Sequence, residues 1–271
     1  MRLYKNRLFR RLLLPLFERL NPGDVRIKHH WTGQPVLLHS YRHKGYWFHG
    51  RRREQQTLEL LGKLIGPNDT VLDVGGHIGY FSLYFGHLAS RGTVHAFEPG
   101  PNNLPYIRQN LKQADNTTLF AQGVGSFPGT LTLYTEQLTG QNNSFVQDYA
   151  MFEENKAAAF SAASVEAVDV QVVTLDSHCA THGLTPSFVK IDVEGFELKA
   201  LEGASELLHS GRPVLMVEVS QEHEAVFSLL REARYRTFDV SLRALDGGSK
   251  LELNTFCFPE ERADELLRKL A

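Results

Sequence analysis

Charged side chains gather in FVKIDVEGFE, residues 188–197. Lys190, Asp192 and Glu194 stand two residues apart, so in a β-strand their side chains share one face. Because charges on a buried strand are unfavourable unless they lie at its open carboxyl end, we expect these three at the rim of a crevice. Glu218, in LMVEVS, ends the next predicted strand at the same rim. A lysine and three carboxylates could deprotonate or orient a nucleophile, and they are our candidate catalytic residues.

Two other roles fit the same four residues. The lysine and the carboxylates could form a structural ion pair, with Asp192 or Glu194 capping the following helix. Alternatively, Asp192, Glu194 and Glu218 could hold Mg²⁺, which prefers carboxylate oxygens. Their spacing does not require a metal, so we assign no metal site.

A second constellation lies in VLDVGGHIGYF, residues 71–81. Apolar residues lead to an aspartate and then to glycines, which is typical of a buried strand that ends in a tight turn and opens a helix. Gly75, Gly76 and Gly79 would let a ligand approach the backbone, and the first amides of the helix are free to bind it. Glu98 ends the next predicted strand, in TVHAFEP, where it could accept hydrogen bonds from ribose hydroxyls.

The two acids discriminate between two classes of nucleoside cofactor. A dinucleotide needs its pyrophosphate at the helix N-terminus, and Asp73, just before the glycines, would repel it. The same carboxylate suits a ligand with an ammonium and a sulfonium group. Asp73 and Glu98 therefore favour S-adenosylmethionine (SAM) over NAD, and the absence of a G-x-G-x-x-G turn argues against an oxidoreductase. Helix capping by Asp73 and an exposed strand end at Glu98 are the alternative interpretations.

Alternating elements must position both constellations. Apolar strands and amphipathic helices alternate from residue 70 onward, which indicates an α/β fold with a parallel sheet covered on both faces. The predicted strands are 70–74, 93–98, 118–124, 188–193 and 213–219, with two more in YRTFDV and LELNTFCFP. The predicted helices are 80–88, 101–113, 197–208 and 223–233, with one more in RRREQQTLELLGKLIG. Ligands of such sheets bind beyond the carboxyl ends of the strands, where both constellations lie.

Two stretches interrupt this alternation. GTLTLYTE (129–136) and VDVQVVTLDS (168–177) indicate an added β-pair. The polar, alanine-rich segment 137–166 between them is predicted to be a mobile loop. This loop could close over an acceptor and supply hydrogen-bonding side chains from NNSF (142–145), or it could be disordered at the surface.

The front of the chain differs in charge from the rest. Up to Arg53 there are thirteen Lys and Arg and two acids, or +11, so the remainder carries −13 to give the net charge of −2. We predict an amphipathic helix at 3–20 and strands at 25–49. The basic front could bind an anionic partner or dock on the acidic body. Its helix could also make weak contact with a membrane surface.

Composition narrows the class of protein. The chain has 271 residues, of which 42% are hydrophobic and 22% charged, as in ordinary globular proteins. Cys179 and Cys257 are too few for a disulfide framework and indicate free thiols in a cytoplasmic protein. No apolar run approaches a membrane span of about 18 residues, and no secretory signal is predicted. An isoelectric point near 6.6 and the lack of a nucleic-acid motif argue against a nucleic-acid partner.

In chain order, VLDVGGHIGYFSL, VHAFEP, NNSF, VVTLDS and VKIDVEGFELKALEGA resemble the FkbM-type SAM-dependent methyltransferases, with KIDVEG-x-E the most specific block. The resemblance implies a class I, Rossmann-like fold with a mostly parallel seven-stranded sheet and helices on both faces. It also implies methyl transfer to a hydroxyl of a sugar, glycoside, macrolide or related metabolite. We therefore predict a basic extension at 1–50 and a methyltransferase domain at 51–271 that carries the inserted β-pair.

The resemblance also implies roles for individual residues. Lys190, Asp192, Glu194 and Glu197 match its second motif. The family commonly has Ala-Asn where this chain has Gly76-His77, which leaves the role of His77 open. The predicted SAM-binding residues are Asp73, Gly75, Gly76, His77, Gly79, Phe81, Glu98 and Asn102.

For the reaction, we expect Asp192 to be the base, with Glu194 or Glu218 as the next choices. His29, His30 and His223 are further candidates. The basic front favours an acidic small-molecule acceptor, such as a uronic acid, a nucleotide-linked sugar or a glycolipid. The rival function is a non-catalytic SAM-binding or assembly protein, which would have no need of carboxylates at a buried edge.

Overall fold

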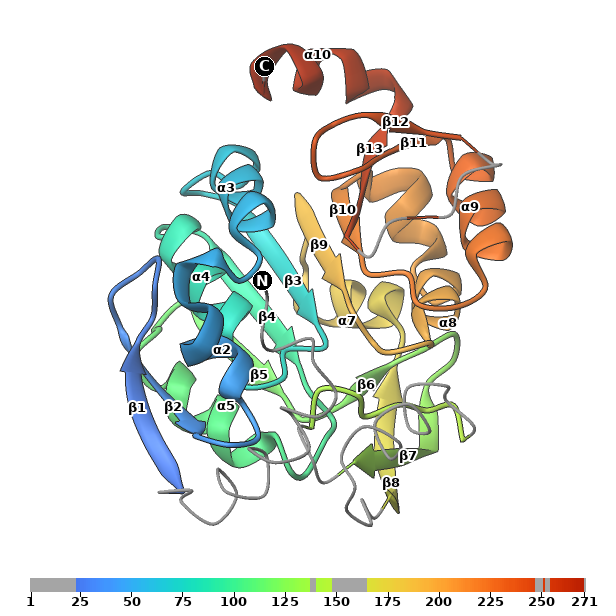
Figure 1. Ribbon diagram of the computed structural model, residues 1–271. Coiled ribbons are helices and arrows are strands. Elements are labelled where there is room, and N and C mark those ends of the chain that lie inside the picture. The colour runs from blue at the N-terminus through green and yellow to red at the C-terminus, as the bar shows by residue number, and fades with distance from the viewer. Residues whose placement is uncertain (1–22, 137–139, 148–164, 247–250, 252–253, 271) are drawn as a thin grey trace, which may run out of the picture.

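The computed structural model describes residues 23–136, 140–147, 165–246, 251 and 254–270. The helix predicted at 3–20 and most of the loop predicted at 137–166 lie outside the described residues. One eight-stranded sheet forms the centre (Figure 1). Its strands are β3 (Thr70–Val74), β4 (Thr93–Phe97), β5 (Thr117–Phe120), β9 (Phe188–Ile191), β10 (Val214–Val217), β11 (Tyr235–Phe238), β12 (Ala244–Leu245) and β13 (Thr255–Pro259).

The strands of this sheet run in the order β12-β11-β13-β10-β9-β3-β4-β5. The five from β10 to β5 are parallel, as the alternation of strands and helices predicts. β13 runs antiparallel to both β10 and β11. Seven of the strands have four or five residues each, and seven is the number of strands that the sequence predicts. The eighth, β12, has two residues and extends one edge.

Helices cover both faces of the sheet, because successive strand residues point to opposite sides. Val71 packs in one apolar core and Leu72 in the other. The helices of the first core are α3 (Gln55–Leu64), α4 (Tyr80–Leu88), α5 (Leu104–Leu111) and α10 (Glu260–Leu270). The second core holds α7 (Leu175–His182), α8 (Glu197–Glu202), α9 (His223–Glu232) and the π-helical turn η3 (Leu207–Gly211). None of the described helices is long and apolar enough to cross a membrane.

One predicted helix is divided in two. The helix expected at 197–208 ends at Glu202, and η3 begins only at Leu207. Between them, the backbone of Gly203 lies so close to the Gly125 carbonyl that a Cβ atom would overlap it. This close approach comes from a segment about 80 residues away in the chain, so local periodicity cannot reveal it.

A separate three-stranded sheet holds the predicted β-pair. β7 (Gly129–Glu136) runs antiparallel to β8 (Val165–Val173), and β6 (Gly123–Val124) pairs in parallel with β8. The single strand predicted at 118–124 is therefore wrong, because the chain passes from the main sheet to the small one after β5. The strand predicted at 168–177 also ends earlier than expected, at Val173. The Thr174 hydroxyl then caps helix α7.

The front of the described chain forms a hairpin and a short helix. β1 (Asp24–Lys28) pairs antiparallel with β2 (Pro35–His39). The strand expected after them is wrong, because Lys44–His49 forms helix α2 and Gly50–Arg52 forms the 3-10 turn η2. Tyr46 of α2 is buried in the core that contains α4. Tertiary packing therefore outweighs the β-propensity of KGYWFH.

Polar contacts attach this front segment to α5. The Asn110 amide group accepts from the Leu37 backbone amide at 2.7 Å and donates to the Leu37 carbonyl at 2.9 Å. The Tyr106 hydroxyl donates to an Asp24 carboxylate oxygen at 2.8 Å. The described part of the front segment is therefore fixed against the sheet domain.

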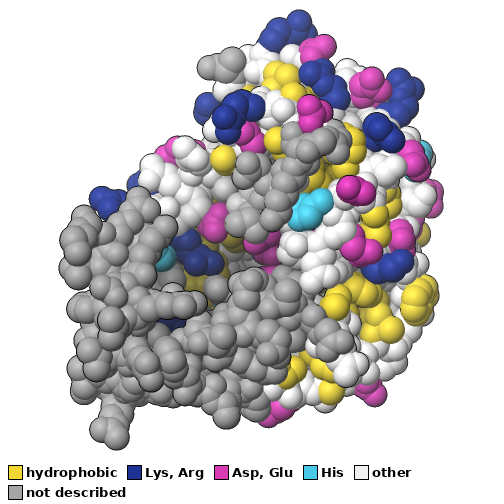
Figure 2. All heavy atoms as spheres, turned by 45° about the vertical axis from the view of Figure 1, so that its right-hand side comes forward, with side chains coloured by type: hydrophobic (Ala, Val, Ile, Leu, Met, Phe, Trp, Pro, Cys, Tyr) yellow, Lys and Arg dark blue, Asp and Glu magenta, His cyan; other side chains and the backbone are white. Residues whose placement is uncertain are grey.

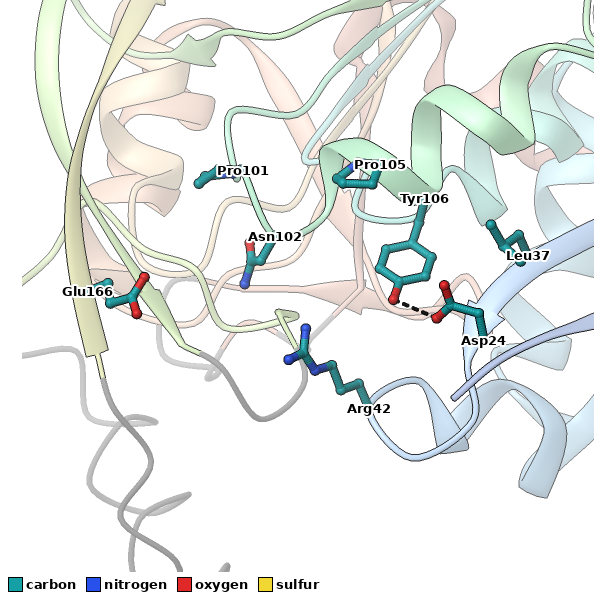
Figure 3. A pocket seen from close by; sticks show the side chains of 8 residues that line it. All are labelled: Asp24, Leu37, Arg42, Pro101, Asn102, Pro105, Tyr106 and Glu166. Carbon is teal, nitrogen blue, oxygen red and sulfur yellow. Dashed lines mark hydrogen bonds between the residues drawn. The ribbon is translucent and has the colours of Figure 1, made fainter. Parts of the chain in front are cut away.

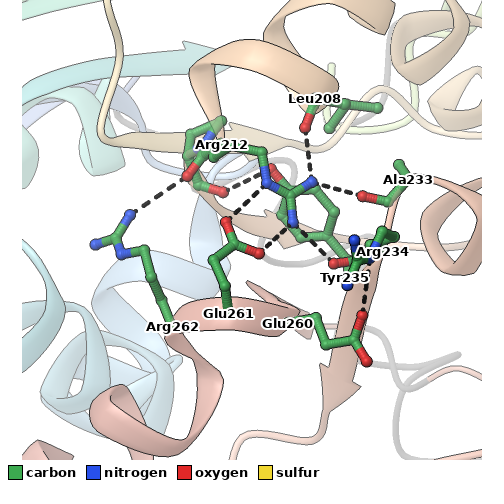
Figure 4. A network of polar contacts seen from close by, with 9 residues as sticks. Leu208, Arg212, Ala233, Arg234, Tyr235, Glu260, Glu261 and Arg262 are labelled. Carbon is green, nitrogen blue, oxygen red and sulfur yellow. Dashed lines mark hydrogen bonds and ion pairs between the residues drawn. The ribbon is translucent and has the colours of Figure 1, made fainter.

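Arg212 connects α10 to the second core (Figure 4). Its guanidinium forms a bidentate pair with Glu261 of α10, at 2.9 and 2.7 Å. It also donates to the carbonyls of Leu208, Ala233 and Arg234. Figure 2 shows basic and acidic side chains mixed at the top of the molecule, where α10 lies. The outer face of α10 is thus charged, and the pair between Arg212 and Glu261 connects the start of α10 to the rest of the protein.

We expect Arg212→Ala to lower the free energy of unfolding by about 2–3 kcal/mol, because three carbonyls and one carboxylate lose their shared donor. Arg212→Lys should recover only part of this, since an ammonium cannot form the bidentate pair. Urea unfolding measures the difference. Arg236→Ala, which removes an exposed pair with Asp264, is the control and should change stability by less than about 1 kcal/mol. Equal effects of the two alanine variants would contradict the assignment.

A histidine pair packs beside β4. His95 Nδ1 lies 2.8 Å from His178 Nε2, and both rings are buried. One ring must donate and the other accept, so the accepting imidazole must be neutral. Burial, followed by the neighbouring His182 and His95, lowers the pKa of His178 to about 4.

This pair predicts acid sensitivity. Because the folded pKa of His178 lies below the unfolded value, the unfolded state binds more protons, and stability falls as the pH drops below about 6.5. Between pH 7 and 5 we expect His178 to account for a loss of about 1–2 kcal/mol in the free energy of unfolding. Urea unfolding at both pH values should show a smaller loss for His178→Gln. The exposed His209→Gln variant should retain the wild-type loss, and an unchanged loss in His178→Gln would contradict the prediction.

Candidate active site

Two neighbouring strands bring the predicted charged residues together. In the register of β3 and β9, Lys190 lies opposite Asp73. The Lys190 ammonium is 3.1 Å from an Asp192 oxygen and 3.4 Å from an Asp73 oxygen. It donates a hydrogen bond of 3.1 Å to the Gly75 carbonyl and lies 5.5 Å from the centre of the Phe81 ring. The two sequence motifs therefore meet at one buried cation.

Neighbouring carboxylates keep Lys190 charged. Burial by itself lowers the pKa of this ammonium, but Asp192 and Asp73 outweigh burial, and the net shift is upward. Lys190 is therefore protonated at neutral pH, so it orients Asp192 and cannot itself remove a proton. Asp73 is fully buried and also accepts a hydrogen bond from the Ser82 hydroxyl. Its carboxylate acts on the crevice through Lys190.

Glu194 leaves the strand face that its spacing predicts. β9 ends at Ile191, and Glu194 has a left-handed φ of 50°, so the chain has already turned. The Glu194 carbonyl accepts a hydrogen bond of 2.6 Å from the Ser144 hydroxyl. Its carboxylate lies near enough to Glu218 to raise the pKa of that residue.

Glu218 follows β10 at the same edge, where its amide donates to the Ile191 carbonyl at 2.9 Å. Burial, followed by the charges of Asp192 and Glu194, raises the pKa of Glu218 to about 9. Glu218 is therefore protonated at neutral pH and can donate a hydrogen bond. Asp192, whose side chain is 24% exposed, is then the accessible carboxylate next to Lys190.

Glu197 of the second motif and two of the candidate histidines make contacts within the protein. Glu197 is buried and accepts a hydrogen bond of 2.9 Å from the Gly195 amide, and burial raises its pKa to about 7. His29 Nε2 lies 3.0 Å from the Tyr80 carbonyl, and His30 Nδ1 lies 2.9 Å from the Tyr80 hydroxyl. Both histidines therefore contact Tyr80, the first residue of α4.

The glycine turn is held against β4 and β9. The amides of Gly75 and Gly76 both donate to the Phe97 carbonyl, at 3.0 and 2.9 Å. Gly75 has a φ of 83°, and a Cβ atom there would overlap the Asp192 carbonyl oxygen. Only glycine allows this close approach, which joins the turn to the segment that follows β9. Gly79, also at a φ of 83°, precedes the first residue of α4.

Glu98 lies beneath the turn and joins two loops. One carboxylate oxygen accepts from the His77 backbone amide at 2.7 Å. The other accepts from the Gly100 amide at 2.8 Å and from the Asn103 side chain at 3.2 Å. Burial outweighs these hydrogen bonds and raises the pKa of Glu98 to about 7.

Tyr46 of α2 is a site residue that the sequence did not indicate. Its hydroxyl lies 3.1 Å from His77 Nδ1. Burial raises the pKa of Tyr46, and the charges of Arg53, Lys190 and Asp192 also act on it. The only signal in the sequence is the His77 departure from the family pattern. The front segment thus contributes a side chain that contacts the glycine turn.

The Asn102 side chain is hydrogen-bonded to the end of β7 and to the segment that follows it. Its amide nitrogen donates to the Glu136 carbonyl at 3.0 Å, and its oxygen accepts from Asn143 at 2.7 Å. Ser144, the next residue of NNSF, reaches Glu194 on the far side of the crevice. NNSF therefore links the loop after β4 with the loop after β9.

A pocket of about 430 Å³ lies beside the crevice at the start of α5 (Figure 3). It shares Asn102 with the loop contacts above, and Arg42 projects into it from the front segment. Its lining residues are Asp24, Leu37, Arg42, Pro101, Asn102, Pro105, Tyr106 and Glu166. The candidate catalytic residues Lys190, Asp192, Glu194 and Glu218 are not among these lining residues.

The side chains of the crevice fit a cofactor that carries positive charge. Asp73 and Asp192 share one ammonium, that of Lys190. Glu98 has a second lone pair on the oxygen that the His77 amide occupies, which suits a ribose hydroxyl. This set matches an ammonium, a sulfonium and a ribose. Within the described residues, no three His, Cys, Asp or Glu side chains are grouped to hold a metal ion.

SAM affinity should depend on the ionisation of Glu98. With a pKa of about 7, its carboxylate is mostly ionised at pH 8 and mostly neutral at pH 6. Because the ionised form is expected to bind SAM, the Kd should rise about tenfold when the pH is lowered from 8 to 6. Calorimetry on Glu98→Gln should give weaker binding without this pH dependence. Glu202→Gln, an exposed change on α8, is the control, and a Glu98→Gln variant with wild-type pH dependence would contradict the prediction.

The family profile of the methyltransferase FkbM domain matches residues 73–237, which include both the glycine turn and the Lys190–Glu218 group. This chain belongs to that family. It is a SAM-dependent methyltransferase with a class I fold, as the sequence motifs predict. The NAD-dependent and non-catalytic alternatives are thereby set aside.

Three relatives match different shares of the chain. Hexuronic acid methyltransferase AglP of Haloferax volcanii is 26% identical over 69% of this chain and 71% of its own length. The 2-O-methyltransferase NoeI of Sinorhizobium fredii is 24% identical over 62% of this chain and 69% of its own length. The 31-O-demethyl-FK506 methyltransferase FkbM of Streptomyces tacrolimicus is 50% identical over 18% of this chain and 19% of its own.

Proposed function

We propose that this enzyme transfers the methyl group of SAM to a hydroxyl of a small-molecule acceptor, and that the acceptor is a sugar or glycoside. The names of three relatives support this class of acceptor, since they specify a hexuronic acid, a 2-O position and a 31-O position. A macrolide-type hydroxyl is the second candidate, supported by the FK506 enzyme.

The observation that carries this proposal is the accessible Asp192 carboxylate, 3.1 Å from the buried Lys190 ammonium. When bound, SAM supplies an electrophilic methyl group. Asp192 accepts the proton of the acceptor hydroxyl as the oxygen bonds to the methyl carbon and the carbon–sulfur bond breaks. Lys190 fixes the direction of the carboxylate, and protonated Glu218 can donate a hydrogen bond to the acceptor.

The acidic rim favours a hydroxyl over a carboxylate acceptor. A carboxylate needs no base, and Asp192 and Glu194 would repel it. An acidic sugar could still bind with its carboxylate directed away from this rim, toward the basic front. We propose that the first fifty residues shape the acceptor side, because Tyr46 lies within reach of His77.

For the cofactor, we propose that Gly75, Gly76, Gly79 and His77 form the turn against which SAM lies, with Glu98 at the ribose. Asp73 and Phe81 contact the Lys190 ammonium and so help to position it. Asn102 contributes by fixing the NNSF segment near the ligand.

The test is methyl transfer from labelled SAM to a panel of glucuronides, galacturonides, matching neutral glycosides and a macrolide with a free hydroxyl. We expect a product that survives mild alkali, because an ether is stable where a methyl ester is hydrolysed. An alkali-labile product, or transfer to none of the panel, would overturn the proposal.

A further inference from the structure

The outer face of α2 carries an exposed aromatic pair. Trp47 is 45% exposed and Phe48 is 57% exposed. Among the described residues, Phe127 is the only other exposed large hydrophobic side chain, at 57%. Arg51 and Arg52 of the adjacent turn η2 are also exposed. We call these four residues, Trp47, Phe48, Arg51 and Arg52, the α2 patch.

Local contacts hold the α2 patch in a defined arrangement. The Trp47 indole donates to the Ser40 carbonyl at 2.7 Å. The Phe48 ring lies edge-on to the Trp47 ring, with 6.3 Å between centroids. The Arg51 guanidinium stacks over the Trp31 ring at 4.3 Å. The aromatic pair is therefore presented outward by a fixed scaffold.

The surroundings of the patch are basic. Residues 39–53 contain five Lys and Arg and no Asp or Glu. Within the part of the chain that the structure describes, Arg51 and Arg52 form no ion pair with a carboxylate. Exposed Trp and Phe beside uncompensated arginines are typical of surfaces that enter the headgroup region of anionic membranes.

We propose that the α2 patch docks this enzyme on an anionic phospholipid surface. A soluble anion would satisfy the arginines but leave Trp47 and Phe48 in water, whereas a bilayer surface offers both negative charge and an apolar layer. The inner side of the same helix carries Tyr46, which lies 3.1 Å from His77. Docking through α2 would therefore bring the crevice next to the lipid, where a lipid-linked acceptor could reach it.

The test uses the intrinsic fluorescence of Trp47. The chain has two tryptophans, so Trp31→Phe leaves Trp47 as the single reporter. We expect a blue shift with vesicles of phosphatidylcholine containing roughly 30% phosphatidylglycerol, and none with phosphatidylcholine alone. Co-sedimentation of the wild-type chain with the same vesicles is the independent measurement.

Two variants locate the binding surface. Trp47→Ser with Phe48→Ser, and separately Arg51→Gln with Arg52→Gln, should each weaken co-sedimentation about tenfold or more. Phe127→Ser removes an equally exposed aromatic at another site and should bind as the wild type does. The proposal is overturned if the paired variants bind vesicles unchanged, or if an acidic polysaccharide such as hyaluronate is bound and anionic vesicles are not.

Discussion

Replacing Asp192 by asparagine is expected to lower kcat by about 10²–10⁴-fold, because the acceptor hydroxyl loses its proton acceptor. The chain should remain folded, since Lys190 keeps its contacts with Asp73 and the Gly75 carbonyl. The Kd for SAM should change by less than about threefold, because the carboxylate acts on the acceptor. Single-turnover methyl transfer and calorimetry measure the two quantities separately.

Glu202→Gln provides the matched control for this experiment, because it removes an exposed carboxylate from α8. It should leave both kcat and SAM affinity at their wild-type values. If Asp192→Asn weakens SAM binding strongly and leaves kcat intact, Asp192 is a cofactor ligand and the base must be sought elsewhere. Glu194 is then the next candidate, because Glu218 is already protonated at neutral pH.

Lys190→Met is expected to destabilise the protein by about 3–5 kcal/mol, because it leaves the fully buried Asp73 without its cation. The expected readout is a lower midpoint of urea unfolding together with loss of SAM binding. Lys199→Met removes another lysine ion pair, but an exposed one with Glu202, and should change stability by less than about 1 kcal/mol.

A double variant separates the charge from the packing of Lys190. Asp73→Asn with Lys190→Met removes both buried charges and should recover most of the lost stability, though not the activity. If the double variant is as unstable as the single one, the apolar stem of Lys190 against Phe81 carries the stability. In that case the ion pair is of minor importance to the fold.

The sequence alone determined the family, the parallel sheet and the two charged motifs. Strand and helix boundaries such as Thr70–Val74 and Tyr80–Leu88 are confirmed to the residue. These elements follow from local patterns, namely apolar runs, helical spacing and glycine turns, which a single chain displays directly. The correct prediction that Lys190 and Asp192 share one face rests on the same kind of periodicity.

Only the tertiary structure decided which partners these residues have. The opposition of Asp73 to Lys190 depends on the register of β3 and β9, which are separated by more than 100 residues. Helix α2 formed where β-propensity predicted a strand, because the core accepts Tyr46. Burial, which no local pattern measures, raises the pKa of Glu218, and on this ground we propose Asp192 as the proton acceptor.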